Sequence, residues 1–201
     1  MAIKAIIFDF GGVLLDWNPH YLYRKFFDGD HKAMENFLQE IDFSTWNAEQ
    51  DRGRAFAEGV AVLSEQFPQH AELIRAYPER WEESIGGAID GTVEILARLK
   101  KQGYSLYGLS NWSAETYPRV QHKFEFFGWF EGIVLSGEVK LAKPDPKIYH
   151  LLLEKAGVPA SECLFIDDSL SNVQAAKALG FRTIHFRSPE QLEAELVVIG
   201  I

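Results

Sequence analysis

The stretch AIIFDFGGVLLD, residues 5–16, decides how the rest of the chain is organised. It opens on an apolar run rich in β-branched and aromatic residues, which predicts a strand buried on both faces, as in a parallel sheet. Asp9 ends that run, where open α/β sheets bind their ligands. Gly11 and Gly12 follow and allow the backbone to approach a ligand closely. Taken alone, the stretch also fits a strand that ends in a capping Asp and a glycine turn.

Length and composition limit the class of protein. The chain has 201 residues, 47% of them hydrophobic and 24% charged, which is enough for one core plus a small second module. A net charge of −9 without a Lys/Arg-rich run argues against nucleic acid and anionic membranes as partners. The single cysteine, Cys163, is expected to be a buried, inert thiol. The amino terminus is too polar for a signal peptide or membrane span, so we expect a cytoplasmic protein.

After residue 90 the hydrophobic pattern alternates between strands and helices. Strands are expected at 104–109, 132–135, 163–167 and 183–186, and helices at 92–102, 114–127, 145–156, 170–179 and 189–197. Such alternation predicts an α/β fold, a Rossmann-like parallel sheet with right-handed crossovers and helices on both faces.

Between residues 18 and 88 the pattern is helical, and no convincing strand stands out. One helix is expected at 54–67, with Pro68 and Pro78 as boundaries. We therefore predict a small all-helical cap, residues 16–88, inserted after the first strand of a core formed by residues 1–15 and 89–201. Such an insert would hang over the carboxyl edge of the sheet, directly above Asp9.

Polar side chains follow two more of the predicted strands. Ser110 and Asn111 end the second strand just before a helix, where free N–H groups make either a phosphate seat or a simple N-cap. Lys143 begins the loop KPDP, whose prolines restrict the backbone. The loop would aim one ammonium group into the cleft, unless Lys143 is a solvated surface residue.

Asp167 and Asp168 end the fourth strand. Paired carboxylates after an apolar run are costly unless a cation is near, and Mg²⁺ prefers such ligands. The alternative is an acid-rich helix amino terminus. Together the four strand ends predict one cleft with a nucleophile, a phosphate seat, an ammonium group and a metal site.

These motifs, in this order, resemble the haloacid dehalogenase superfamily, most of whose members are phosphatases. The matching stretches are FDFGGV (8–13), LSN (109–111), KPDP (143–146) and IDDS (166–169), and the resemblance covers the whole chain. The helical insert resembles the subclass I cap of that family. The resemblance implies a five-stranded parallel sheet with the Asp9 strand in its centre.

The resemblance also implies a role for each matched residue. Asp9 would be the nucleophile that forms an aspartyl-phosphate. Ser110 and Lys143 would hold the transferring phosphoryl group, with Asn111 beside them.

Magnesium is the cofactor that the resemblance implies. Its ligands would be Asp9, Asp168 and the main-chain carbonyl of Gly11, with Asp167 binding directly or through water. The expected partner is a small phosphate ester, whereas nothing in the sequence indicates the oligomeric state.

One departure from the family pattern concerns Gly11. Phosphatases of the family usually carry a second Asp two residues after the nucleophile, where it acts as general acid and base. The metal-free 2-haloacid dehalogenases of the family also lack it, but the Asp167–Asp168 pair favours a metal enzyme. A branch with Asp-x-Gly-x-Val in this motif includes glucose-1-phosphate phosphatases, and the chain resembles that branch most.

We therefore expect a Mg²⁺-dependent phosphatase that acts on a small phosphorylated metabolite, with sugar phosphates favoured. The alternatives are a metal-free 2-haloacid dehalogenase and a catalytically weak protein that binds a phosphate ligand.

Cap residues cannot be matched by motif. Trp46 and Asp51 lie in a polar stretch between predicted helices and are the favoured contacts to the leaving group. His20 or Asp51 could supply the proton that position 11 lacks. Further candidates are Trp17, Arg52, Arg54 and Trp81, although the core of the cap is the favoured place for the tryptophans.

Overall fold

The centre of the molecule is a parallel sheet of five strands in the order β5-β4-β1-β6-β7. The structure, a computed structural model, describes residues 2–201. The strands are β1 (Ala5–Phe8), β4 (Ser105–Ser110), β5 (Gly132–Leu135), β6 (Cys163–Asp167) and β7 (Arg182–His185). β1 lies in the centre, paired in parallel with β4 on one side and β6 on the other. This confirms the predicted fold class.

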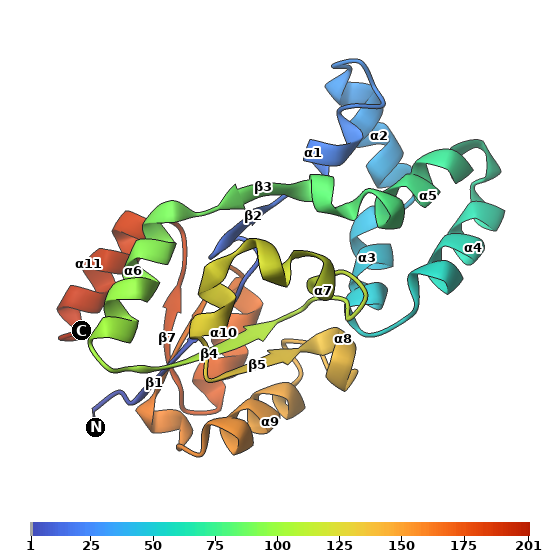
Figure 1. Cartoon of the computed structure of the whole chain (residues 1–201). Coiled ribbons are helices and arrows are strands. Elements are labelled where there is room, and N and C mark those ends of the chain that lie inside the picture. Colours follow the sequence, from blue (N-terminus) through green and yellow to red (C-terminus); the bar gives the residue numbers. More distant parts are fainter. Residues whose placement is uncertain (1) are drawn as a thin grey trace.

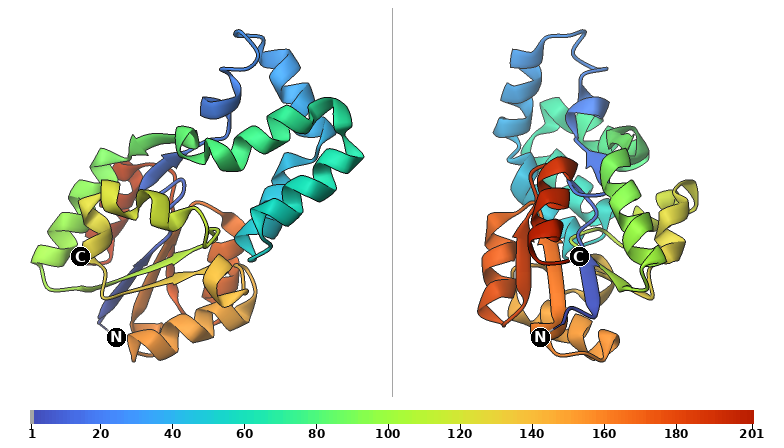
Figure 2. Two further views of the ribbon diagram at one scale, coloured as in Figure 1. Left: turned by 45° about the vertical axis from the view of Figure 1, so that its right-hand side comes forward. Right: turned by 90° about the vertical axis from the view of Figure 1, so that its left-hand side faces the viewer.

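Helices cover both faces of the sheet (Figures 1 and 2). The long ones are α6 (Asp90–Lys101), α9 (Pro146–Ala156), α10 (Leu170–Ala178) and α11 (Pro189–Val198). Because side chains alternate along a strand, Ile6 and Phe8 pack in the cluster that includes α6 and α11. Ala5 and Ile7 pack with α9 and α10, in a cluster that also buries Cys163 as expected. Burial on both faces explains the uninterrupted apolar run of β1.

The helix expected at 114–127 is broken into short pieces. These are α7 (Tyr117–Val120), η3 (Gln121–Lys123) and η4 (Glu125–Trp129). Phe126 and Phe127 are both buried, and Phe127 packs edge-on against Phe10. The packing of these two aromatic rings against each other and against the core accompanies the break, so tertiary packing overrides the helical pattern here. The remaining short elements of this half are α8 (Ser136–Val139) and η5 (Ala160–Glu162).

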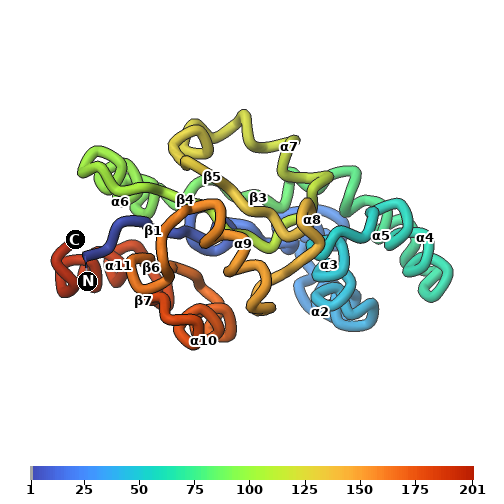
Figure 3. Tube along the Cα trace, turned by 90° about the horizontal axis from the view of Figure 1, so that it is seen from below, coloured from blue at the N-terminus to red at the C-terminus, as the bar shows by residue number. Residues whose placement is uncertain are grey.

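A second group of helices lies beyond one end of the strands (Figure 3). It comprises α1 (His20–Tyr23), α2 (His31–Glu40), α3 (Phe43–Asp51), α4 (Phe56–Gln66), η1 (Pro68–His70), α5 (Ala71–Glu79) and η2 (Trp81–Ser84). Their shared core is aromatic, with Tyr77 stacked on Tyr23 and packed edge-on against Phe43. Pro68 begins η1, whereas Pro78 lies inside α5 near its end.

A short antiparallel ribbon connects these helices to the sheet. It pairs β2 (Leu15–Trp17) with β3 (Ile85–Ala88), so the expectation of no strand between residues 18 and 88 was wrong for β3. β3 reads IGGA, and its glycines hide the alternation that predicts a strand. A Cβ at Gly86 would lie 2.6 Å from Asp16 Oδ2, so that position has no room for a side chain. Within residues 2–201, no helix has the length and apolar character needed to cross a membrane.

Candidate active site

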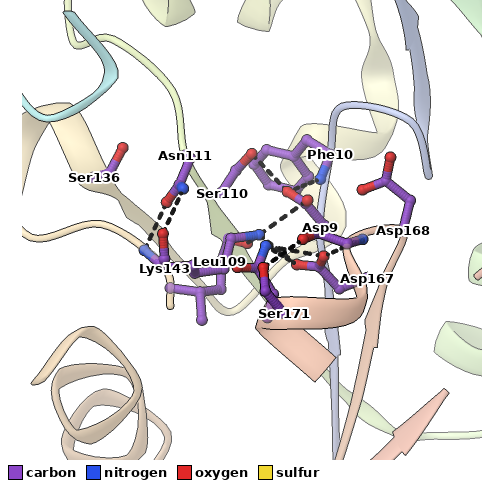
Figure 4. Close-up of polar contacts among 12 residues, drawn as sticks. Asp9, Phe10, Leu109, Ser110, Asn111, Ser136, Lys143, Asp167, Asp168 and Ser171 are labelled. Carbon is purple, nitrogen blue, oxygen red and sulfur yellow. Dashed lines mark hydrogen bonds and ion pairs between the residues drawn. The ribbon is translucent and has the colours of Figure 1, made fainter. Parts of the chain in front are cut away.

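Asp9 follows β1 directly, and its carboxylate is held from several sides (Figure 4). Oδ1 accepts hydrogen bonds from the Phe10 N–H at 2.7 Å and from Ser110 Oγ at 2.8 Å. Oδ2 lies 2.9 Å from Lys143 Nζ. Parallel pairing of β1 with β4 brings Ser110 to the same edge as Asp9. Only 8% of Asp9 is exposed, so its side chain is fixed in one orientation at the carboxyl edge of the sheet.

Lys143 is buried beneath Asp9. Its ammonium group contacts Asp9 Oδ2 at 2.9 Å, Asp167 Oδ2 at 2.6 Å and the Leu109 carbonyl at 2.8 Å, which occupies its three donors. Burial disfavours the charge of Lys143, but the two carboxylates outweigh burial and raise its pKa. In this arrangement the ammonium group positions the carboxylates and neutralises part of their charge.

Asn111 clamps the loop that carries Lys143. Its Nδ2 donates to the Lys143 carbonyl at 2.9 Å, and its Oδ1 accepts from the Lys143 N–H at 2.8 Å. Asn111 therefore fixes the main chain of Lys143, and it also lines the cavity described below.

Asp167 and Asp168 lie at the end of β6, in different surroundings. Asp167 is fully buried, and its Oδ1 accepts from the Ser169 N–H at 2.8 Å and from Asn172 Nδ2 at 3.0 Å. Asp168 is the exposed member of the pair. Ser171 contacts Ser169 Oγ at 2.9 Å.

The carboxylates of Asp9, Asp167 and Asp168 form a group that fits a divalent cation. One oxygen of each lies within 4.8 Å of the others. Burial raises the pKa of Asp9, Lys143 opposes that rise, and the other two carboxylates add to it. One ammonium group cannot neutralise three carboxylates, so the site favours a bound hard cation such as Mg²⁺.

Two glycines shape the space above Asp9. At Gly12 the backbone has φ +72°, and a Cβ would lie 2.3 Å from Asp168 Oδ2, so a side chain would displace Asp168. At Gly11 a Cβ would meet nothing within 4 Å. Position 11 is thus open toward the cleft, and the backbone there accepts a side chain.

Two hollows lie between the sheet edge and the helices above it. We call the smaller, of about 110 Å³, the inner cavity; its lining residues are Gly11, Leu15, Trp17, Asn47, Asp51, Trp81, Ile85, Ser110, Asn111 and Trp112. We call the larger, of about 720 Å³, the outer cleft; it is also lined by Pro19, Phe43, Ser44, Ala48, Lys143, Pro144, Ser169, Ser171 and Asn172. Trp17, Asn47, Asp51 and Asn111 line both.

The favoured cap residues are placed differently from one another. Asp51 lines both hollows. Trp46 is buried among helices α3, α4 and α5, where its Nε1 donates to the Gly59 carbonyl at 2.9 Å, so its expected contact with the leaving group is not seen. The stretch is helix α3, not a polar connection, and Trp46 faces α4 and α5 across the aromatic core. His20 pairs with Glu35 at 3.2 Å and lines neither hollow.

The cap core was the favoured place for Trp17 and Trp81, and the structure corrects this, because both turn toward the site. Trp17 and Trp81 line the inner cavity. Arg52 pairs with Glu49 at 2.7 Å, and Arg54 donates to Gln50 at 2.6 Å, so both guanidinium groups hold α3 together.

Sequence reasoning missed Asn47 and Trp112, which both line the inner cavity. Asn47 lies one helical turn before Asp51, a relation visible only once α3 is recognised as a helix. Trp112 directly follows Ser110 and Asn111, and that adjacency is the signal that could have found it.

Residues 3–180 match the family model described as haloacid dehalogenase-like hydrolase. The chain is 28% identical over 185 residues to a sesquiterpene phosphatase of Aspergillus oryzae, covering 92% of this chain and 90% of that protein. It is 28% identical over 197 residues to a phosphorylated carbohydrates phosphatase of Thermotoga maritima, covering 91% of this chain and 84% of that protein. A HAD family enzyme from Bacteroides thetaiotaomicron, solved in complex with magnesium and inorganic phosphate, is similar at a TM-score of 0.71 and 27% identity, covering 93% and 96%. The chain therefore belongs to the haloacid dehalogenase-like hydrolase family.

Proposed function

We propose that this chain is a Mg²⁺-dependent phosphatase that hydrolyses a small phosphorylated metabolite, with sugar phosphates as the favoured class. The observation that carries the proposal is the fixed carboxylate of Asp9, held by Ser110 and Lys143 beside the second acidic pair. Further support comes from two relatives that are phosphatases and from a similar enzyme solved with magnesium and phosphate.

In this proposal Asp9 attacks phosphorus and forms an aspartyl-phosphate. Hydrogen bonds to both of its oxygens hold it in one orientation, which lowers the entropic cost of reaching the transition state. Ser110 and Lys143 lie next to the position that the phosphoryl group would occupy. Mg²⁺, held by Asp9, Asp167, Asp168 and the Gly11 carbonyl, would supply electrostatic stabilisation of the phosphoryl oxygens.

The proposal assigns the leaving group to the inner cavity. Three indole side chains, those of Trp17, Trp81 and Trp112, offer flat apolar walls, and Asn47 and Asp51 offer polar groups. A sugar ring has apolar faces and polar edges that suit such a lining. The inner cavity is the smaller of the two hollows, which favours a small leaving group.

The same proposal divides the chain into a core, residues 1–15 and 89–201, and a subclass I cap, residues 16–88. The cap helices lie over the edge of the sheet that carries Asp9, and the ribbon of β2 and β3 connects them to the core. We also propose a cytoplasmic location and a small-molecule substrate, which the net charge of −9 and the single buried thiol favour over a nucleic acid and a disulfide-forming compartment.

A substrate screen with and without EDTA tests the proposal. It uses sugar phosphates, a terpenyl phosphate, simple alkyl and aryl phosphates, and 2-haloacids. We expect phosphate release that EDTA abolishes and excess Mg²⁺ restores, with the highest kcat/KM for a sugar phosphate. Halide release that persists in EDTA would instead show a metal-free dehalogenase, and tight phosphate binding without turnover would show a binding protein.

A further inference from the structure

Hydrolysis of a phosphate ester through Asp9 needs a proton donor for the leaving oxygen and a proton acceptor for the attacking water. Gly11 can do neither. Among the described residues that line the inner cavity, Asp51 is the one carboxylic acid. Lys143 faces the outer cleft, but its donors are taken by two carboxylates and a carbonyl. His20, the other candidate, lines neither hollow.

We propose that Asp51, at the end of cap helix α3, is the general acid and base of this enzyme, in place of a carboxylate at position 11. The assignment rests on the proposed phosphatase function. It moves the proton-transfer group from the loop that carries the nucleophile to the opposite wall of the cleft.

The end of α3 is held against the core at Asp51 itself. Ser136 Oγ donates to the Asp51 main-chain carbonyl and accepts the Trp112 N–H at 2.9 Å. Gly53 follows with φ +101°, and a Cβ there would lie 3.0 Å from the Gly137 carbonyl. The close approach of this turn therefore brings Asp51 beside Trp112, two residues after Ser110, the last residue of β4, which contacts Asp9.

The Asp51 side chain is oriented from both walls of the cleft. Asn47 Nδ2 donates to Asp51 Oδ2 at 3.0 Å from the same helix, and the Ser113 backbone hydrogen-bonds to the carboxylate from the core. These partners are uncharged, so they fix the carboxyl group without a permanent ion pair that would keep it ionised.

Burial raises the pKa of Asp51 to about 7, the Ser113 backbone and Arg52 lower it, and Asp9 adds to the rise. A carboxyl group with such a pKa can both donate and accept a proton near neutral pH. The titratable and charged groups around it come from several elements. They are Glu49 on α3 and Arg52 directly after α3, Tyr77 on α5, Asp9 after β1, Glu115 after β4, Glu138 on α8 and Lys140 directly after α8.

The proposed reaction has two steps. An oxygen of Asp9 forms a bond to phosphorus, and the bond from phosphorus to the ester oxygen breaks. The ester oxygen keeps the electron pair and takes the proton of Asp51, which becomes a carboxylate. A water molecule then attacks phosphorus and gives one proton to Asp51, while the bond between phosphorus and Asp9 breaks and returns its electron pair to Asp9. The products are the alcohol and inorganic phosphate.

The test compares Asp51→Asn with Glu49→Gln, a matched loss of one negative charge on an exposed site of the same helix. The substrates are a sugar phosphate of the alkyl ester type, which needs protonation of its leaving group, and 4-nitrophenyl phosphate, which does not. We expect Asp51→Asn to lower kcat/KM for the sugar phosphate by about 10²–10⁴-fold. On the aryl phosphate it should give a burst of one nitrophenol per chain, because water attack then lacks its base. Glu49→Gln should leave kcat/KM for the sugar phosphate unchanged and should give no burst with the aryl phosphate.

A second variant exploits the open position at Gly11. In the Asp51→Asn background, Gly11→Asp places a carboxylate near the same reacting atoms, and it should restore sugar phosphate turnover by more than about 10-fold. In the otherwise native chain, Gly11→Asp should raise sugar phosphate turnover only slightly, because Asp51 is still present.

The pH dependence of turnover by the wild-type chain also tests the role of Asp51, without any substitution. Turnover of the sugar phosphate should fall as pH rises through about 7, where Asp51 loses its proton. Turnover of the aryl phosphate is limited by water attack, which needs Asp51 as a base, so its rate should rise over the same pH range.

The assignment of Asp51 is overturned if Asp51→Asn lowers kcat/KM equally for both substrates and gives no burst, which would show a binding or structural role. It is also overturned if the variant keeps the sugar phosphate rate, or if Gly11→Asp fails to rescue it while Mg²⁺ still binds. The phosphatase proposal fails separately, if the wild-type chain releases phosphate from no ester.

Discussion

The two walls of the cleft each present a carboxyl group whose pKa is raised by burial, yet their surroundings differ. Asp9, on the core wall, lies among charges, with Lys143 at 2.9 Å and the second acidic pair within 4.8 Å. Asp51, on the cap wall, is held by the Asn47 amide and the Ser113 backbone, beside indole rings. Burial raises both pKa values to about 7. Lys143, and a divalent cation when bound, would favour the ionised form of Asp9, whereas the hydrogen-bond partners of Asp51 are uncharged and leave it able to take a proton. The difference suits Asp9 to nucleophilic attack and Asp51 to proton transfer.

The largest expected effect is on the core wall. Asp9→Asn removes the nucleophile but leaves a side chain that still accepts the Ser110 hydrogen bond, so the fold should persist. We expect a loss of activity of more than about 10⁴-fold, larger than for any single cap residue. Steady-state kinetics on the best ester of the screen, with circular dichroism as the folding control, measure it. Residual activity within tenfold of wild type would exclude Asp9 as the nucleophile.

The second effect concerns the charges that distinguish the core wall. Asp168→Ala, or removal of divalent cations, should reduce hydrolysis by a factor on the order of 10³, because a cation is worth several kcal/mol of charge stabilisation. The control is Glu154→Ala, an exposed acid on α9 that is not part of the group formed by Asp9, Asp167 and Asp168. Full activity of the Asp168 variant in excess EDTA would contradict the metal site and favour the dehalogenase interpretation.

The third effect concerns stability and separates the cap wall from the core wall. Burial raises the pKa of Asp51 from 3.8 to about 7, so the folded state binds its proton more tightly than the unfolded state does. Below pH about 4 Asp51 is protonated in both states, and its raised pKa leaves the free energy of unfolding unchanged. As the pH rises, the unfolded state loses the proton first, so the free energy of unfolding falls, and the fall is complete above pH about 7. Asp51→Asn mimics the protonated form at every pH. The variant should therefore be more stable than wild type above pH 7, by on the order of 1–2 kcal/mol, or roughly 2–8 °C in Tm.

Thermal unfolding of both chains across this pH range measures the difference. A gain in stability that accompanies a loss of activity is expected of a functional group and not of a structural one. If Asp51→Asn destabilises the chain equally at all pH values, Asp51 is a structural residue and the contrast between the walls disappears.

The smallest effect is at the contact between the walls. Ser136→Ala leaves the Trp112 N–H and the Asp51 carbonyl without their shared partner, at a cost of about 1–3 kcal/mol in stability. Activity should fall less than about tenfold, since the Asp51 side chain keeps its own hydrogen bonds. Ser64→Ala is the control, because Ser64 Oγ is buried without a hydrogen-bond partner in the part of the chain that the structure describes. Equal melting temperatures for the two variants would show that this contact does not hold the cap.

The core wall could be predicted from the sequence because local signals specify it. Strand ends carry their polar residues in fixed order, and the strands at 132–135 and 163–167 were predicted with the observed bounds. The motif residues Asp9, Ser110 and Lys143 do meet at one edge of the sheet.

The cap wall could not be predicted in the same way, because it depends on how α3 packs. Trp46 and Asp51 lie close in sequence, but five positions along a helix turn them toward different surroundings. Trp46 is buried in the aromatic core, whereas Asp51 lines the inner cavity. The glycines of β3 concealed the ribbon that places the cap, and long-range burial of Phe126 and Phe127 broke a helix that the local pattern favours.

The most direct test is to trap the enzyme between its two steps. Asp51→Asn is mixed with 4-nitrophenyl phosphate and Mg²⁺, quenched in acid during the burst, and analysed by peptide mass spectrometry with fragmentation of the peptide that contains Asp9 and Asp16. We expect one phosphoryl group per chain on Asp9, at a higher occupancy than in the wild-type enzyme, because water attack is slowed. Phosphate release without phosphorylation of Asp9 in either chain would contradict the account.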